Sequence, residues 1–168
     1  MKRVVLTSGP RGAGKSTFIA DYVSHTSGVQ VLSRDELLVE LYGTTMLDRY
    51  TGDHHYASQL FSKKVEDVLE THASIDLIVD YWNGYADARR ALIDEYRRFG
   101  ADRVICWKFV TPKDVCVDWF MNKEDAAGYT RRMVARDYDL YHTNAKSILN
   151  DGFDSVRYVN PTQLEIPF

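Results

Sequence analysis

The sequence has little of what would place it in a special class of protein. Only two of its 168 residues are cysteines, which excludes a fold held together by several disulfides. No apolar run approaches the roughly 20 residues that cross a bilayer, and the chain enters its first predicted strand at Arg3, so neither a membrane span nor a signal peptide is expected. The formal net charge of −3 argues against binding of nucleic acid by a broad basic surface, but not by a local cationic groove.

The two cysteines, Cys106 and Cys116, fall in a predicted buried strand and a predicted helix. Two unpaired core thiols are therefore expected rather than a disulfide, which suits a reducing cytoplasm. A hydrophobic content of 45% and a charged content of 27% are ordinary for a globular protein. The sequence predicts one cytoplasmic domain over residues 1–168 and leaves its oligomeric state open.

A glycine-rich stretch near the N-terminus carries the strongest functional signal. Residues 9–17 read Gly-Pro-Arg-Gly-Ala-Gly-Lys-Ser-Thr, between an apolar segment typical of a buried strand and a segment with helical spacing. Glycines let successive N–H groups point at one anion, and the following helix adds its positive end. The pattern predicts a phosphate-binding loop, in which Lys15 reaches the β- and γ-phosphates of ATP and Ser16 offers its hydroxyl to Mg²⁺. The candidate donor-binding residues are Gly9, Arg11, Gly12, Ala13, Gly14, Lys15, Ser16 and Thr17.

Two aspartates follow predicted strands at the expected ligand-binding edge of a parallel sheet. Asp35 comes after the strand over residues 28–33 and opens a helix, and Asp80 closes the strand over residues 75–80. Asp35 is a candidate catalytic residue, although a helix cap formed by Asp35 or by Ser33 explains the residue type equally well. Asp80 is expected to support Mg²⁺, or else to hold an arginine or the acceptor.

An aromatic-rich stretch, residues 81–85, follows Asp80 at the same edge. Exposed rings there would form a stacking platform for a planar substrate, whereas buried rings would pack under the next helix, and both interpretations stay open. Trp82 and Asn83 are the candidate acceptor contacts in this stretch.

A candidate lid follows the fourth predicted strand and its helix. Residues 122–130 lack apolar periodicity and lead into a helix predicted to run to Asn150, on which Arg132 and Arg136 share a face. A lid over about 122–136 would bring positive charge to the transferred phosphoryl group and exclude water, and solvated surface charge is the alternative. The candidate arginines are Arg131, Arg132 and Arg136, with no choice among them.

Predicted strands and helices alternate along the whole chain. Strands over residues 3–8, 28–33, 75–80, 103–110 and 155–159 are separated by segments with helical spacing. This alternation predicts an α/β fold, with a five-stranded parallel sheet between two layers of helices and a helical lid.

Several short motifs resemble the kinase domain of phage-type and bacterial polynucleotide 5′-kinases, within a wider group of phosphate-loop kinases that includes zeta-toxin-like enzymes. The motifs are the phosphate loop with its preceding strand, residues 33–36 (Ser-Arg-Asp-Glu), and Val79-Asp80 followed by Asn83 and Arg89-Arg90. The resemblance implies the three-layer fold of these kinases, with ATP and Mg²⁺ as cofactors and nucleic acid as substrate. It also implies roles for single residues: Asp35 as general base, Lys15 and Ser16 as phosphate and Mg²⁺ ligands, and Arg34 and Asp80 at the acceptor.

Two positions depart from the pattern of these kinases. Leu38 stands where they carry an arginine that holds the acceptor's 3′-phosphate, and of the lid segment aligned with residues 119–123 only Lys123 keeps a charge. The donor side therefore looks intact while acceptor recognition looks rebuilt. One acceptor that suits this difference is a hydroxymethylated pyrimidine in phage DNA, extruded onto Trp82.

Three functions remain open at this point. The leading hypothesis is an ATP- and Mg²⁺-dependent kinase for a hydroxyl of a polynucleotide, at a 5′ end or on a base such as 5-hydroxymethyluracil. The first alternative is a kinase for a small molecule, nucleoside or nucleotide, which the acidic net charge favours. The second is a nucleotide-binding ATPase or switch without an acceptor.

Overall fold

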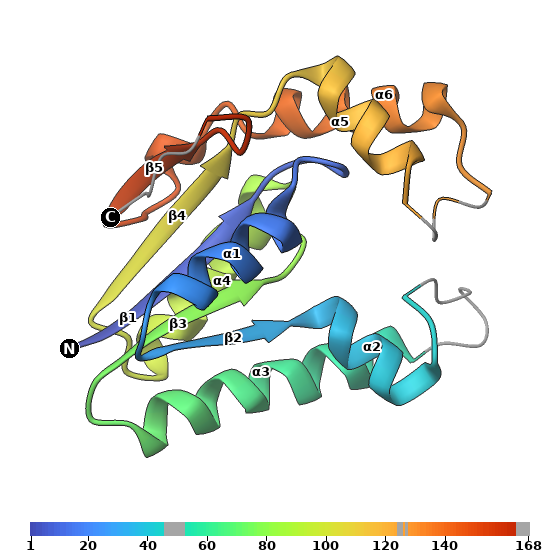
Figure 1. The fold of residues 1–168 in the computed structure, drawn as a ribbon. Coiled ribbons are helices and arrows are strands. Elements are labelled where there is room, and N and C mark those ends of the chain that lie inside the picture. Colours follow the sequence, from blue (N-terminus) through green and yellow to red (C-terminus); the bar gives the residue numbers. More distant parts are fainter. Residues whose placement is uncertain (46–52, 124–125, 127, 164–168) are drawn as a thin grey trace.

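The computed structural model describes residues 1–45, 53–123, 126 and 128–163. Strands and helices alternate along the described chain, and the C-terminal helices end in a short 3₁₀ turn at Ile148–Asn150. The elements are β1 (Lys2–Ser8), α1 (Lys15–His25), β2 (Val29–Ser33), α2 (Arg34–Tyr42), α3 (His54–Thr71), β3 (Ile75–Asp80), α4 (Ala86–Arg98), β4 (Arg103–Phe109), α5 (Lys113–Met121), α6 (Arg131–Asn144) and β5 (Ser155–Val159) (Figure 1).

The sheet brings the carboxyl ends of its strands to one edge. Its order is β2-β3-β1-β4-β5, and every neighbouring pair is parallel, which confirms the predicted five-stranded parallel sheet. The register pairs Ser33 with Asp80 and Leu6 with Val79, so β2, β3 and β1 end side by side. The chain leaves β1 toward β2 on one side and returns to β4 on the other, and ligands bind at such a switch point in open α/β sheets.

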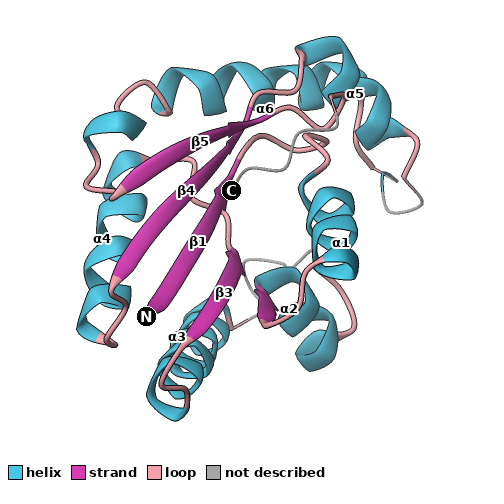
Figure 2. Cartoon of the chain, turned by 60° about the vertical axis from the view of Figure 1, so that its left-hand side comes forward, coloured by secondary structure: helices cyan, strands magenta, loops and turns pink. Residues whose placement is uncertain are grey.

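Helices cover both faces of the sheet because consecutive apolar residues of a strand point to opposite faces. Val4 and Leu6 of β1 pack in one cluster with residues of α3 and α4, whereas Val5 packs in a second cluster with residues of α1. Figure 2 shows α3 and α4 on one side of the sheet and α1 on the other. Trp107 of β4 is fully buried in the second cluster, against Tyr22 and Phe18 of α1.

The helices α5 and α6 lie side by side beyond the carboxyl end of β4, joined by a small apolar cluster that includes Val117, Phe120 and Val134 (Figure 1). The prediction that this helix runs to Asn150 is wrong beyond Asn144, where α6 ends. The carbonyl oxygen of Asn144 accepts a hydrogen bond from Arg89 Nη2 at 2.8 Å. A carbonyl engaged by a side chain in this way terminates the helical ladder.

Both cysteines are buried and unpaired, as predicted. In the described part of the chain, no helix combines the length and the apolar character that a membrane span requires.

Candidate active site

The phosphate loop ends in a helix terminus that is left open. Gly12 and Gly14 have φ angles of +73° and +85°, in the left-handed region that glycine tolerates, and Gly14 is the residue at which α1 begins. Within the described residues no side chain caps this terminus, and its first turn holds no acidic residue. The free N–H groups and the positive end of α1 therefore remain available to an anion.

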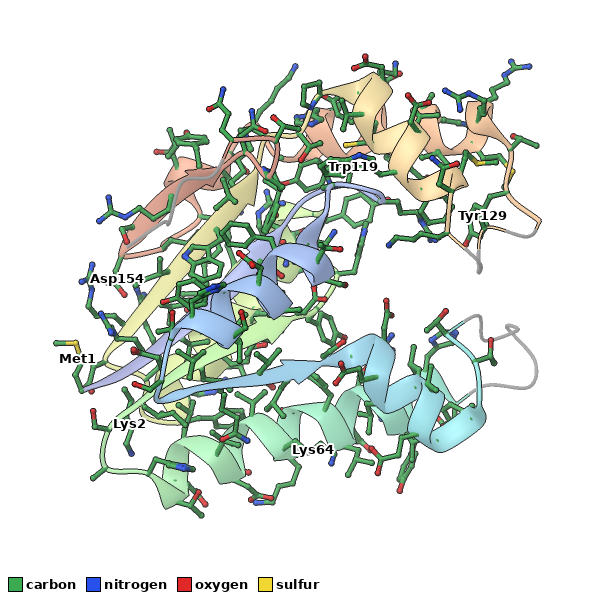
Figure 3. The ribbon with its side chains drawn as sticks, in the orientation of Figure 1. Met1, Lys2, Lys64, Trp119, Tyr129 and Asp154 are labelled. Atoms are coloured by element: carbon green, nitrogen blue, oxygen red, sulfur yellow. The ribbon has the colours of Figure 1, made fainter. Side chains whose placement is uncertain are left out.

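The helix α5 packs directly on this loop. A Cβ atom on Gly12 would overlap the backbone oxygen of Cys116, and one on Gly14 would overlap the ring of Trp119. Glycine is thus required twice over, by backbone conformation and by the close approach of α5. Trp119 and Tyr129 both lie on the α5–α6 side of the molecule, the first over the loop (Figure 3).

Lys15 lies across the mouth of the loop. Its Nζ donates hydrogen bonds to the carbonyl oxygens of Gly9 at 2.8 Å and Pro10 at 3.2 Å. Burial lowers the pKa of Lys15, while the negative charges of Asp80 and Asp35 oppose this shift. The amine and both aspartates therefore act on one another in the same site.

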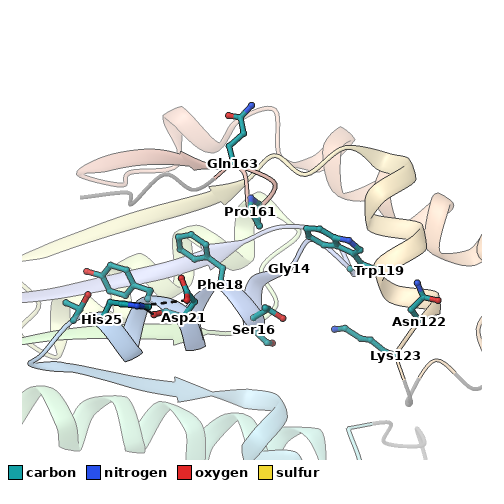
Figure 4. Close-up of a pocket in the computed structure, with 14 residues that line it drawn as sticks. Gly14, Ser16, Phe18, Asp21, His25, Trp119, Asn122, Lys123, Pro161 and Gln163 are labelled. Atoms are coloured by element: carbon teal, nitrogen blue, oxygen red, sulfur yellow. Dashed lines mark hydrogen bonds and ion pairs between the residues drawn. The ribbon is translucent and has the colours of Figure 1, made fainter.

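A cavity of about 830 Å³ extends from the phosphate loop along α1 and under α5. Figure 4 shows Trp119 beside Gly14, Pro161 across the cavity, and Lys123 reaching toward Ser16. Its walls combine aromatic rings with the polar N-terminal turn of α1, a combination that suits a planar base attached to phosphates. The lining includes Gly12, Ser16, Thr17, Phe18, Tyr22 and Asn122.

The geometry separates Asp35 from the capping of its helix. Ser33 caps α2, since its Oγ accepts a hydrogen bond from the Glu36 N–H at 3.3 Å, so capping does not account for Asp35. Partial burial raises the pKa of Asp35, and the charge of Asp80 raises it further. Lys15, Arg34 and Arg11 lower it, in that order. A carboxylate with a raised pKa, facing the phosphate loop, has the properties of a general base.

Asp80 is fixed by β1. Its Oδ1 accepts a hydrogen bond from Thr7 Oγ1 at 3.0 Å, and among the described residues no hydrogen bond engages its other oxygen. Magnesium beside a nucleotide takes one or two protein oxygens and completes its shell with phosphates and water. The hydroxyl of Ser16 and the carboxylate of Asp80 suit that requirement, and no larger cluster of His, Cys, Asp or Glu occurs among the described residues.

Arg34 lies on the acceptor side and is only loosely held. Its guanidinium lies 5.2 Å from the centre of the Tyr81 ring, and its Nη2 reaches Ser58 Oγ at 3.4 Å. Its Nε is buried without a hydrogen-bond partner in the described structure. Leu38, where the resemblance leads one to look for an arginine, is 2% exposed and belongs to the core.

The aromatic stretch after β3 divides into a buried and an exposed part. Tyr81 packs against Phe61, whereas Trp82 and Tyr85 are 54% and 46% exposed, with ring centres 5.2 Å apart. Both interpretations of the stretch therefore apply, each to different residues. Asn83 is 3% exposed, and its amide Nδ2 donates hydrogen bonds to the carbonyl oxygens of Thr7 and Tyr81. This arrangement favours a positioning role for Asn83 over direct contact with an acceptor.

The three candidate lid arginines are not among the main charges that act on the pKa of Lys15 or of Asp35. Arg131 pairs with Asp118, and it lines with Arg132 a shallow hollow between α5 and α6. Arg136 is exposed, about 200° around α6 from the buried Val134. Positions 124, 125 and 127 of the expected lid lie outside the described residues. The cations that act on Asp35 are Lys15, Arg34 and Arg11, and the cation that acts on Lys15 is Lys123.

Lys123 belongs to a short sequence motif that lies outside the phosphate loop and the arginine-bearing helix. Residues 122–125 read Asn-Lys-Glu-Asp, the Asn-Lys-x-Asp pattern that reads guanine in GTP-binding switches, and Asn122 and Lys123 line the large cavity. The pattern stands at the C-terminal end of α5, and residues 124 and 125 lie outside the described part of the chain. The motif makes guanine, beside adenine, a candidate base of the donor nucleotide.

Solved structures share this architecture at low sequence identity. A chain of the Pnkp1/Rnl/Hen1 RNA repair complex matches 87% of this chain with a TM-score of 0.73 and 14% identity. The tunicamycin resistance protein of Deinococcus radiodurans matches 98% at 0.63 and 14%, and a sugar kinase from Janibacter sp. HTCC2649 matches 97% at 0.60 and 17%. The matches cover 46%, 89% and 87% of those chains, so this chain spans about half the length of the first.

At such identities the likeness concerns the fold, which is that of phosphate-loop kinases, as predicted. No curated protein matches the sequence. A family model, AAA_33, described as an AAA domain, matches residues 4–144, which include the phosphate loop, both aspartates and most of α6. Because that match covers most of the sequence, the chain belongs to the AAA_33 family.

Proposed function

We propose that the protein is an ATP- and Mg²⁺-dependent phosphotransferase that moves the γ-phosphoryl group to a hydroxyl of a polynucleotide. The observation that carries the proposal is the meeting of Lys15 and Asp35 in one site, where each charge acts on the pKa of the other. A donor cation beside a carboxylate with a raised pKa is what phosphoryl transfer to a hydroxyl requires.

Each part of the site has a task in this reaction. Lys15 and the open terminus of α1 would hold the donor phosphates, and the cavity under Trp119 would take the base. Asp35 would orient the acceptor hydroxyl and receive its proton. Magnesium, held by Ser16 and Asp80, would neutralise charge on the phosphates when bound.

Two features support a polynucleotide as the acceptor. The exposed pair Trp82 and Tyr85 lies beside the phosphate loop, in a hollow also lined by Arg11, and offers rings on which bases stack. The likeness to a chain of an RNA repair complex agrees with it. Among polynucleotide acceptors, a hydroxymethylated pyrimidine would make the fullest use of Trp82 and Tyr85, because an enzyme that acts on a base extrudes it from the duplex and stacks it on such rings.

A small-molecule hydroxyl is the second candidate acceptor. The net charge of −3 favours it, and so do the matches to a sugar kinase and a tunicamycin resistance protein, which cover almost all of both chains. An ATPase would use the same carboxylate to activate water, so the rate of hydrolysis with and without an added hydroxyl compound distinguishes it from a kinase.

The test is transfer of labelled γ-phosphate from ATP, and separately from GTP, to a panel of acceptors. The panel contains 5′-hydroxyl DNA and RNA, duplex DNA with hydroxymethylpyrimidines, nucleosides, sugars and small alcohols, and Lys15→Met serves as the blank. Transfer to a polynucleotide should weaken steeply between about 50 and 200 mM salt, whereas transfer to a neutral small molecule should not. Nucleotide hydrolysis that no hydroxyl compound accelerates would reject the proposal.

A further inference from the structure

Phosphoryl transfer requires a cation in addition to Lys15, and the phosphate loop itself carries one, Arg11. Negative charge on a phosphoryl group in flight is stabilised by preorganised cations, in related reactions often by an arginine. The arginines of α6 are not among the main charges that act on Lys15 or Asp35. Arg11 belongs to the phosphate loop itself, and its charge lowers the pKa of Asp35, so the two groups act on one another across the site.

Arg11 is tied to the segment from α5 to α6 by two partners. Its Nε forms an ion pair with Asp137 at 2.9 Å, and its Nη1 donates a hydrogen bond to the Tyr129 hydroxyl at 2.7 Å. Its guanidinium also lies 5.0 Å from the centre of the Tyr129 ring, which in turn contacts Phe120 of α5. We call Arg11, Tyr129 and Asp137 the loop clasp.

The clasp is built so that Arg11 can change partners. The side chains of Arg11 and Asp137 are 48% and 38% exposed, and ion pairs between exposed groups contribute little to stability. A hollow of about 100 Å³ adjoins Arg11 between the phosphate loop, the Trp82–Tyr85 pair and α6. A nucleoside triphosphate in the loop would therefore compete with Asp137 for Arg11. The planar guanidinium can hold two phosphate oxygens at once.

We propose that Arg11 contacts the transferred phosphoryl group and that Asp137 and Tyr129 hold it beside the site until the donor binds. The inference rests on the proposed phosphotransfer. In that step the bond from the γ-phosphorus to the bridging donor oxygen breaks, a bond to the acceptor oxygen forms, and the acceptor proton passes to Asp35. Arg11 offsets the charge that builds up on the non-bridging oxygens.

The test separates the charge of Arg11 from its place in the clasp. It compares Arg11→Gln, Arg11→Lys and Asp137→Asn, with Arg98→Gln on α4 as the matched control for loss of a surface arginine. Melting temperatures verify the fold of each variant. Arg11→Gln should lower kcat about 10³-fold with little change in the KM for ATP, and Arg11→Lys should recover part of the loss. Asp137→Asn opens the clasp but leaves the cation, so its kcat should stay near that of the wild type.

Three results would overturn the inference. Equal losses in Arg11→Gln and Asp137→Asn would make the clasp merely structural, and a loss confined to the acceptor KM would make Arg11 an acceptor contact. A loss in Arg136→Gln with Arg11→Gln unaffected would return the role to α6.

Failure of the proposed function has a different signature. If the wild type transfers to no acceptor, hydrolysis takes water as the acceptor and Arg11→Gln should slow it by the same factor. A wild type that neither transfers nor hydrolyses would reject both proposals together, whereas wild-type transfer undiminished in Arg11→Gln rejects this one alone.

Discussion

The donor half and the acceptor half of the candidate site are built in different ways. The phosphate-binding part of the donor half is one contiguous stretch, residues 9–17, whose backbone N–H groups and single lysine follow from its own conformation. The acceptor half gathers Asp35 and Asp80 from the ends of two strands and Trp82 from a loop. A local motif therefore specifies the donor half, whereas tertiary packing specifies the acceptor half.

The acceptor half depends on a buried ion pair remote from the chemistry. Arg89 of α4 is 0% exposed, pairs with Asp151 at 2.6 Å and donates to the carbonyl oxygens of Asn83 and Gly84 at 3.0 Å. It thus holds the loop that presents Trp82. Arg11, by contrast, is half-exposed, and in the mechanism proposed above it changes partners. Arg89 therefore supports the framework of the site, whereas Arg11 takes part in the reaction.

The largest expected effect distinguishes loss of the carboxylate in the acceptor half from loss of the lysine in the donor half. Asp35→Asn should lower transfer by about 10²–10⁴-fold while ATP still binds, since only the base is lost, and Lys15→Met should lose both. Because the pKa of Asp35 is raised in the folded state, its charge above that pKa costs stability. The asparagine variant should therefore melt at the same or a higher temperature at neutral pH. Near-normal transfer by Asp35→Asn would remove Asp35 from its role.

The next effect tests the framework of the acceptor half. Arg89→Met leaves Asp151 buried without its main partner and should lower the free energy of unfolding by about 3–5 kcal/mol, measured by urea denaturation. The neighbouring Arg90, half-exposed and 3.4 Å from the same carboxylate, is the matched control, and Arg90→Met should cost less than about 1 kcal/mol.

The double variant Arg89→Met/Asp151→Leu should regain stability, because no charge then remains buried alone. If Arg89→Met cost no more than the Arg90 control, the acceptor half would not rest on this ion pair.

The same division explains what the sequence could and could not predict. The loop glycines, Lys15 and the five strands were readable because each depends on local conformation or on period-2 burial. The partners of a side chain were not readable. The amide Nδ2 of Asn83 is engaged by backbone carbonyl oxygens, and the main cations that act on Asp35 are Lys15, Arg34 and Arg11 rather than an arginine of α6, because side-chain direction on a helix depends on which face packs.

The end of α6 at Asn144 shows the same limit. Its sequence continues with residues that tolerate a helix, but the side chain of Arg89, 55 residues away in the sequence, takes the carbonyl oxygen of Asn144. No window of sequence around α6 contains that information.

A smaller effect distinguishes the aromatic rings of the two halves. Trp119→Ala should weaken ATP binding about tenfold, because stacking on a base contributes about 1–3 kcal/mol, and should leave the acceptor KM unchanged. Trp82→Ala should do the reverse if the acceptor carries a base. The measurement is the pair of KM values for each variant. A Trp82→Ala variant with an unchanged acceptor KM would favour a small acceptor without a planar ring.

The smallest effect measures how charges from both halves meet on one carboxyl group. The neighbours of Asp35 act on its pKa in opposite directions, Asp80 upward and Lys15 and Arg34 downward. In metal-free protein, an NMR titration of the Asp35 carboxyl carbon should therefore give a lower pKa in Asp80→Asn and a higher pKa in Arg34→Gln than in the wild type. The opposite signs exclude a general loosening of the fold, which would move both variants toward the ordinary value of a solvated aspartate. A pKa of Asp35 that is unchanged in both variants would show that Asp35 lies outside the field of its neighbours, and the two halves would then not share a site.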